Sequence, residues 1–176
     1  RDKISLFCDV DREAVVALET ASTIYEVPLM LEAAGLGTFI CDRLGLGGCV
    51  PDLDGWRTMV DRLKEPRVQV PIAIVGEHVQ LQDAYYSVRE ALVHAALPHG
   101  CEPSLHWINS RSLAQGDTAA LRGVQGIVVP GSSHYQSMDG LITTATFARQ
   151  NGVPFLGIDT GMHAMVVEFA RSIPGL

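Results

Sequence analysis

The sequence predicts an α/β protein whose larger part is a doubly wound, mostly parallel sheet with helices on both faces. The first observation is a regular alternation of strand-sized apolar runs and helix-sized segments from residue 70 onward. The second is the presence of glycine-containing turns directly after several of these runs. Strands separated by helices of this length are typical of parallel sheets, because parallel neighbours need a long crossover connection.

The alternation of predicted strands and helices occupies residues 70–176. Each predicted strand is a short run rich in β-branched or other apolar residues, and each predicted helix is long enough to return the chain to the start of the next strand. We expect strands at 70–75, 104–108, 125–130 and 154–158, and helices at 83–97, 112–122, 139–150 and 161–171.

The first 46 residues predict a remnant of a second α/β domain. Residues 4–8 form an apolar, strand-sized run, followed by aspartates that offer caps for a helix. Residues 29–35 predict a short apolar helix closed by a glycine. A buried parallel strand needs neighbours on both edges, so residues 1–46 indicate the end of a larger domain.

A change of composition separates this remnant from the predicted sheet. Residues 47–69 begin with a cluster of glycines and prolines, which predicts a linker. Within the linker, residues 56–64 predict an amphipathic helix that stops before Pro66, because proline cannot continue a helix.

Composition excludes several classes of function. With 47% hydrophobic and 19% charged residues, the chain has the composition of a globular protein. A formal net charge of -7 excludes a basic face able to neutralise nucleic-acid phosphates. The longest apolar runs fall far short of the roughly 20 residues of a membrane helix, and no signal-peptide pattern stands at residue 1. We expect a cytoplasmic protein with no nucleic-acid and no membrane partner.

The cysteines indicate neither a disulfide framework nor a metal site. Cys8, Cys41, Cys49 and Cys101 form no CxxC pair and have no histidines at zinc-ligand spacing. We expect no metal ion and no cofactor held by this chain, in a reducing compartment.

The turn around Asp159 has the spacing of a nucleophile elbow. A predicted strand runs directly into a predicted helix, with Gly157 two residues before Asp159 and Gly161 two residues after it. Small flanks let the central side chain stand on a strained turn beside the amides of a helix N-terminus. A carboxylate cannot take the acyl group of glutamine as a thiolate does, because its attack would give an anhydride.

Three roles for Asp159 follow from its position. It is a helix cap, a relic of a lost nucleophile, or a nucleophile or base towards a different substrate, such as an alkyl or phosphoryl centre. His163 lies four residues further on, on the same face of the predicted helix. Its side chain could form a weak surface ion pair with Asp159, or it could share a proton with the Asp159 carboxylate. Ligands of such sheets bind at the carboxyl ends of the strands, which are residues 76–78, 131–135 and 159–161.

Several segments occur in the order in which they are found in one enzyme family. They are 3–8 (KISLFC), 24–29 (IYEVPL), 43–46 (RLGL), Trp56, 72–76 (IAIVG), 83–88 (DAYYSV), 126–131 (GIVVPG) and 154–163 (PFLGIDTGMH). Together they resemble the CTP synthase family over nearly the whole chain. The last segment is similar to the Gly-Ile-Cys-Leu-Gly-Met-Gln elbow of that family's glutaminase domain.

The resemblance implies a domain organisation and an activity. Residues 1–46 would be the end of the amidoligase domain, 47–69 the linker, and 70–176 the first half of a class I glutamine amidotransferase domain. Family members phosphorylate UTP with ATP and replace the phosphate with ammonia released from glutamine. The resemblance implies ATP, magnesium and nucleotide substrates for a complete family member only, together with a homo-oligomer.

The chain departs from the family where the glutaminase chemistry is expected. Asp159 replaces the nucleophilic cysteine. In the former glutamine pocket, Gly161 and Met162 match the family, whereas His163 replaces a residue that contacts glutamine. The family's Gly-Lys-Tyr after the first strand is Gly-Glu-His at 76–78.

The former oxyanion loop departs in the same way. The family has Pro-Gly-Gly-Phe-Gly, whereas this chain has Gly131, Ser132, Ser133 and His134 after the proline. Two glycines that would let backbone amides approach the substrate are therefore replaced. At the end of the amidoligase part, Thr20 stands where the family presents an acidic residue to adenine.

These departures predict a glutaminase half that no longer hydrolyses glutamine, in a protein that makes CTP from free ammonia. The family's triad histidine and glutamate, and the P-loop of the ligase, fall outside residues 1–176. The alternative is an assembly or regulatory module without catalysis.

Overall fold

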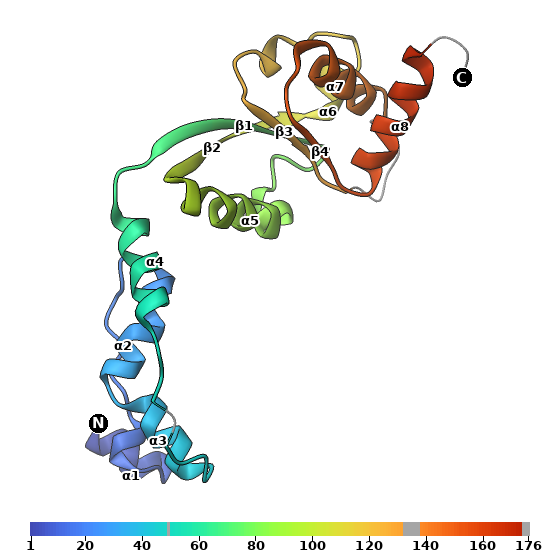
Figure 1. The fold of residues 1–176 in the computed structure, drawn as a ribbon. Coiled ribbons are helices and arrows are strands. Elements are labelled where there is room, and N and C mark those ends of the chain that lie inside the picture. Colours follow the sequence, from blue (N-terminus) through green and yellow to red (C-terminus); the bar gives the residue numbers. More distant parts are fainter. Residues whose placement is uncertain (49, 132–137, 174–176) are drawn as a thin grey trace. The chain divides into compact units, whose positions relative to one another are not determined.

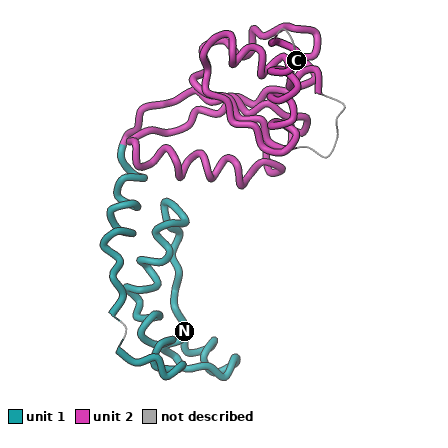
Figure 2. Tube along the Cα trace, turned by 45° about the vertical axis from the view of Figure 1, so that its right-hand side comes forward, with its two compact units in different colours: residues 1–65 teal, residues 66–176 magenta. Residues whose placement is uncertain are grey.

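The computed structural model describes residues 1–48, 50–131 and 138–173. The chain divides into two compact units, unit 1 at residues 1–65 and unit 2 at residues 66–176 (Figure 2). Unit 1 is helical wherever it has regular structure in the described residues, and unit 2 contains the sheet (Figure 1).

Unit 1 consists of short helices joined by turns and by segments without regular secondary structure. Gly35 lies between α2 and α3 with φ 80, a left-handed conformation that suits glycine. The elements are α1 (Asp2–Cys8), the 3-10 turns η1 (Arg12–Ala14) and η2 (Ile24–Glu26), α2 (Val27–Ala33), α3 (Leu36–Arg43) and α4 (Asp54–Lys64).

The predicted strand at residues 4–8 is wrong, because these residues belong to helix α1. The described part of unit 1 offers no strand to pair with this segment. A helix satisfies its backbone hydrogen bonds internally, whereas a lone strand cannot. The helix expected after residue 11 is only the single turn η1, and α3 was not predicted.

Helix α4 contacts the rest of unit 1 through three residues spaced four apart, which therefore share one face of the helix. The Trp56 indole Nε1 donates a hydrogen bond to the Tyr25 carbonyl oxygen at 2.7 Å. Val60 is buried, and Lys64 forms an ion pair with Glu26. The hydrogen bonds from Lys64 and then Ser22 lower the pKa of Glu26 to about 2.

Unit 2 is built on a four-stranded sheet with strand order β2-β1-β3-β4, and all neighbours are parallel. In register, Ile72 of β1 lies opposite both Leu105 of β2 and Gly126 of β3. The strands are β1 (Val68–Gly76), β2 (Cys101–Asn109), β3 (Gly126–Val129) and β4 (Phe155–Gly157). These strands confirm the predicted parallel sheet.

The chain reverses its direction of winding between β1 and β3. From β1 it passes to β2 on one side, and it then returns to place β3 and β4 on the other side. The carboxyl ends of β1 and β3 therefore flank a topological switch point, where doubly wound sheets bind ligands.

Helices cover both faces of the sheet, with α5 on one face and α7 and α8 on the other (Figure 1). The helix predicted at 112–122 is wrong. It is broken into α6 and η5, because Gly116 lies between them with φ 85. The elements are η3 (Gln82–Tyr85), α5 (Tyr86–Ala96), η4 (Leu97–His99), α6 (Ser110–Leu113), η5 (Ala119–Leu121), α7 (Met138–Asn151) and α8 (Thr160–Ser172).

Helices α7 and α8 are joined by an ion pair over the core. Glu168 is buried, with 4% of its side chain exposed, and the Arg149 guanidinium donates to both of its carboxylate oxygens at 2.8–3.1 Å. Ser172 donates a further hydrogen bond at 2.7 Å. The hydrogen bonds from Arg149 make the largest contribution to lowering the pKa of Glu168, and the bond from Ser172 lowers it further.

Candidate functional site

The turn between β4 and α8 has the backbone of a nucleophile elbow. Asp159 adopts φ 50 and ψ -110, outside the conformations that side chains with a Cβ prefer. The Ile158 amide donates to the Val129 carbonyl at 2.9 Å, which ties the approach to the turn to β3. Gly161 N donates to the Ile158 carbonyl oxygen at 3.0 Å on the far side of the turn.

The flanking glycines are required by close approach of the backbone. A Cβ on Gly157 would lie 2.5 Å from the carbonyl carbon of Gly161. A Cβ on Gly161 would lie 2.4 Å from the carbonyl oxygen of Val129. Helix α8 therefore packs directly on β3 and β4, and this packing holds Asp159 on its turn.

The Asp159 side chain occupies the N-cap position of α8 but forms no cap hydrogen bond. It is exposed, and Thr160 Oγ1 donates to its Oδ2 at a long 3.4 Å. A Cβ on Gly131 would lie 3.1 Å from Asp159 Oδ2. The carboxylate thus stands over Gly131, the second residue after the buried strand β3.

Helix α8 places the remaining residues of the predicted glutamine pocket at its first turns. Gly161 is buried, Met162 is half exposed at 50%, and His163 is partly buried. The His163 amide donates to the Asp159 carbonyl oxygen at 3.1 Å. The structure therefore brings Gly131, Asp159 and the start of α8 together, whereas Ser132, Ser133 and His134 lie outside the described residues.

The carboxyl ends of β1 and β2 bring Glu77, at a strand end that the sequence indicated, together with Asn109 and Arg111, which sequence reasoning missed. Glu77 follows β1, has only 7% of its side chain exposed, and forms an ion pair with Arg111. The Asn109 side-chain amide donates to the Glu77 carbonyl oxygen at 3.4 Å. Asn109 is the last residue of β2, and Arg111 follows it in α6. No glycine turn marks this strand end in the sequence.

Tyr85 fixes the turn after β1. Its hydroxyl oxygen accepts a hydrogen bond from the His78 amide at 3.1 Å, and the residue is only 6% exposed. A Cβ on Gly76 would lie 2.6 Å from the same oxygen, so a larger residue there would displace the Tyr85 hydroxyl. His78 itself is exposed.

Thr20 belongs to unit 1 and lies on a cavity of about 560 Å³ within that unit. The cavity has charged side chains around it, including Glu19, Glu26, Arg57 and Lys64. Thr20 is exposed on a segment without regular secondary structure.

The described residues contain no group of three or more His, Cys, Asp and Glu side chains placed to hold a metal ion. No single described helix has the length and apolar character needed to cross a membrane, although the bent pair Ile24–Ala33 and Leu36–Arg43 together meets these criteria.

Two families match separate parts of the chain. The family described as glutamine amidotransferase class-I matches residues 80–174. The family described as CTP synthase N-terminus matches residues 1–46. The first match covers β2, β3 and the elbow, and the second covers the helical part before the linker.

The similar proteins are CTP synthases. The chain is 48% identical over 176 residues to the CTP synthase of Dehalococcoides mccartyi, covering 99% of this chain and 32% of the relative. It is 50% identical to that of Thermomicrobium roseum, covering 100% of this chain and 32% of the relative. The chain therefore spans about a third of the length of these relatives.

A solved structure shares the fold of unit 2. It is the glutaminase domain of Trypanosoma brucei CTPS with bound acivicin. The TM-score is 0.54 at 33% identity, over 60% of this chain and 42% of that chain.

Proposed function

Because this chain belongs to the class-I glutamine amidotransferase family, we propose that it is part of a CTP synthase, or a close relative, that aminates UTP with free ammonia. The CTP synthase relatives and the match at residues 1–46 support the first half of this proposal. The second half rests on Asp159.

The observation that carries the proposal is an intact elbow with a carboxylate on it. The turn keeps the strained backbone and the close glycines that an elbow nucleophile needs. The side chain on it cannot form the thioester through which glutamine is hydrolysed. A relic of a lost cysteine explains both facts, since packing of α8 on β3 preserves the turn whatever its side chain.

The carboxylate also disfavours glutamine binding. Asp159 Oδ2 stands over Gly131, where the substrate amide would lie between the elbow and the oxyanion loop. Its negative charge opposes the oxyanion that forms during acyl transfer. We therefore expect binding as well as turnover to be lost, unlike the effect of removing a cysteine from an intact pocket.

Calorimetric titration of the protein with L-glutamine tests this part of the proposal. We expect no saturable heat at millimolar ligand, whereas a dissociation constant below about 1 mM would contradict it. The Trypanosoma brucei glutaminase domain, which was solved with bound acivicin, is the positive control, with acivicin as a second ligand.

In the whole protein that carries this chain, the Asp159→Cys variant separates the nucleophile from the rest of the pocket. We expect it to remain without glutaminase activity, because Ser132 and His134 replace the glycines of the oxyanion loop. Recovery of glutamine hydrolysis in this single variant would show that only the nucleophile had been lost.

A second candidate is an assembly or regulatory module without catalysis. It is favoured by the apolar side chains exposed on both units, among them Phe7 at 83% and Val166 at 62%. Sedimentation velocity tests it. A monodisperse monomer at every accessible concentration would exclude self-assembly, whereas concentration-dependent association without CTP formation would favour the module.

A further inference from the structure

A cavity of about 720 Å³ opens on unit 2 near the amino ends of β3 and β4, whereas Asp159 lies at their carboxyl ends. Val124 and Val153, which line it, stand two residues before β3 and β4 respectively, whereas Gly131 and Asp159 follow these strands. Its volume lies within the range of small-molecule sites, which is about 300–1,000 Å³. The cavity therefore belongs to a different end of the sheet from the elbow.

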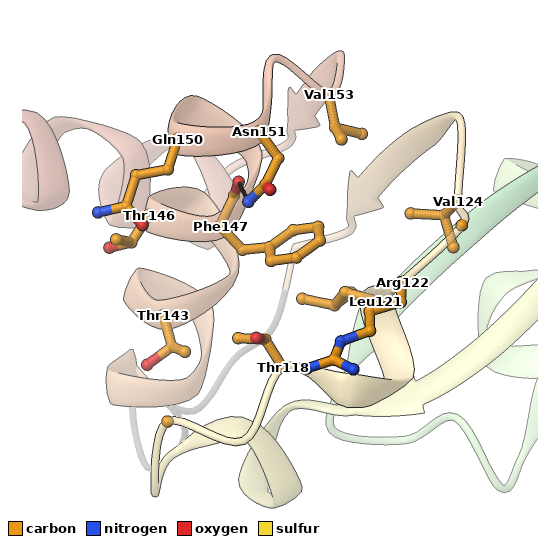
Figure 3. Close-up of a pocket in the computed structure, with 12 residues that line it drawn as sticks. Thr118, Leu121, Arg122, Val124, Thr143, Thr146, Phe147, Gln150, Asn151 and Val153 are labelled. Carbon is orange, nitrogen blue, oxygen red and sulfur yellow. Dashed lines mark hydrogen bonds between the residues drawn. The ribbon is translucent and has the colours of Figure 1, made fainter.

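One wall of this cavity supplies hydrogen-bond donors. It is formed by the segment before β3, where Thr118 and the guanidinium of Arg122 lie side by side (Figure 3). Arg122 is exposed, and it takes part in no ion pair within the described residues. Its planar fork of N–H groups matches the oxygens of a phosphate or a carboxylate.

The opposite wall, on α7, supplies acceptors. Thr143 donates its hydroxyl proton to the Asp139 carbonyl at 2.9 Å, and Thr146 donates to the Ile142 carbonyl at 3.0 Å. A hydroxyl whose proton is committed to the helix presents only lone pairs to a ligand. The Asn151 Nδ2 donates one of its two protons to the Phe147 carbonyl at 2.8 Å (Figure 3). Its Oδ1 is an acceptor, and the second Nδ2 proton is a further donor.

Apolar groups lie between the two walls. The Phe147 ring extends from α7 towards Leu121 and Val124 (Figure 3). Leu121 is fully buried, so it closes the base of the cavity. A ligand that fills this space therefore has a carbon body, with an anion towards Arg122 and O–H donors towards α7.

We propose that this cavity binds a small polyhydroxylated anion, namely a sugar phosphate or a sugar acid. The anionic group pairs with Arg122, the hydroxyls donate to Thr143, Thr146 and Asn151, and the carbon face of the molecule lies on Phe147. This site does not depend on glutamine or ammonia chemistry, so the proposed function can fail without affecting it.

Isothermal titration of the 176-residue chain tests the proposal, with D-ribose 5-phosphate and D-ribonate as separate probes. We expect at least one of them to bind saturably with a dissociation constant below about 1 mM. Binding of only one probe identifies the anionic group as phosphate or carboxylate. Inorganic phosphate and D-ribose, the halves of the first probe, should each bind at least about tenfold more weakly.

Variants assign the binding to this cavity. Arg122→Met should weaken it at least about tenfold, since a hydrogen bond to a charged group is lost. Thr143→Val, which keeps the shape of the side chain, should weaken it about fivefold. Arg171→Met is the matched control, because Arg171 is exposed on α8 and does not line the cavity.

Three results would overturn the proposal. They are the absence of saturable heat with both probes, an unchanged affinity in Arg122→Met, and inorganic phosphate binding as tightly as D-ribose 5-phosphate. Thermal unfolding of each variant, compared with the parent chain, shows that a loss of binding does not come from loss of the fold.

Discussion

At the scale of single residues, the conformation of Asp159 is the most informative feature of the chain. A residue with a Cβ in such a sparsely populated region costs about 1–3 kcal/mol, and it persists only where the surrounding structure imposes it. Here the packing of Gly157 and Gly161 against neighbouring backbone imposes it. The missing cap bond shows that Asp159 is not held there as an ordinary helix cap.

Asp159→Gly should therefore stabilise the chain. Glycine adopts positive φ at no steric cost, so we expect the free energy of unfolding to rise by about 1 kcal/mol despite the greater entropy of the unfolded chain. Chemical denaturation monitored by circular dichroism measures the change. Asp159→Ala removes the same carboxylate but keeps the Cβ, so an equal gain in both variants would show that charge rather than strain is responsible.

At the scale of elements, the described contacts of helix α4 with the rest of unit 1 include the Trp56 hydrogen bond, the buried Val60 and the ion pair of Lys64. The pKa of Glu26 lies at about 2, below its ordinary value of 4.5, because Lys64 and Ser22 stabilise the carboxylate. A lowered pKa in the folded state contributes stability above the ordinary pKa, and this contribution disappears as the pH falls.

The attachment of α4 should consequently weaken between pH 4.5 and about 2. Emission from Trp56, whose indole bonds to the Tyr25 carbonyl, measures this change in a Trp107→Phe background. Glu26→Gln should remove this acid transition. A transition of unchanged midpoint in the variant would assign it to another carboxylate.

The ion pair between Arg149 of α7 and Glu168 of α8 should contribute more to stability than the ion pair of α4, because Glu168 is buried. Arg149→Met leaves this carboxylate without its cation, which typically costs about 3 kcal/mol or more. Thermal and urea unfolding should show this loss, and the deficit should shrink as acid protonates Glu168. Arg171→Met, on the exposed end of α8, should change stability by less than about 0.5 kcal/mol. A loss in Arg149→Met no larger than in this control would contradict the assignment.

The elements of unit 2 could be predicted where hydrophobic periodicity alone determines them. Helix α7 and the buried strand β3 agree with their predicted ranges to within about two residues. The segment at 112–122 could not be predicted, because Leu113 and Leu121 are both buried as in a continuous helix, yet Gly116 turns the chain between them. Residues 4–8 have the composition of a strand, and they form a helix where no strand lies beside them.

At the scale of the whole molecule, part of the candidate site is local and part depends on strand order. The elbow is contained in consecutive residues, so its spacing predicts it. The pairing of Glu77 with Arg111 joins residues 34 apart at the ends of neighbouring strands. It follows only from the placement of β2 beside β1, which no local pattern specifies. The same is true of the cavity between α7 and the segment before β3.

The central claim is that the protein carrying this chain makes CTP from ammonia and not from glutamine. Its most direct test is the rate of CTP formation from UTP, ATP and magnesium, measured with ammonium chloride and with L-glutamine as alternative nitrogen donors. We predict CTP formation with ammonium chloride and no detectable CTP with glutamine. A glutamine-dependent rate comparable with the ammonia-dependent rate would contradict the claim.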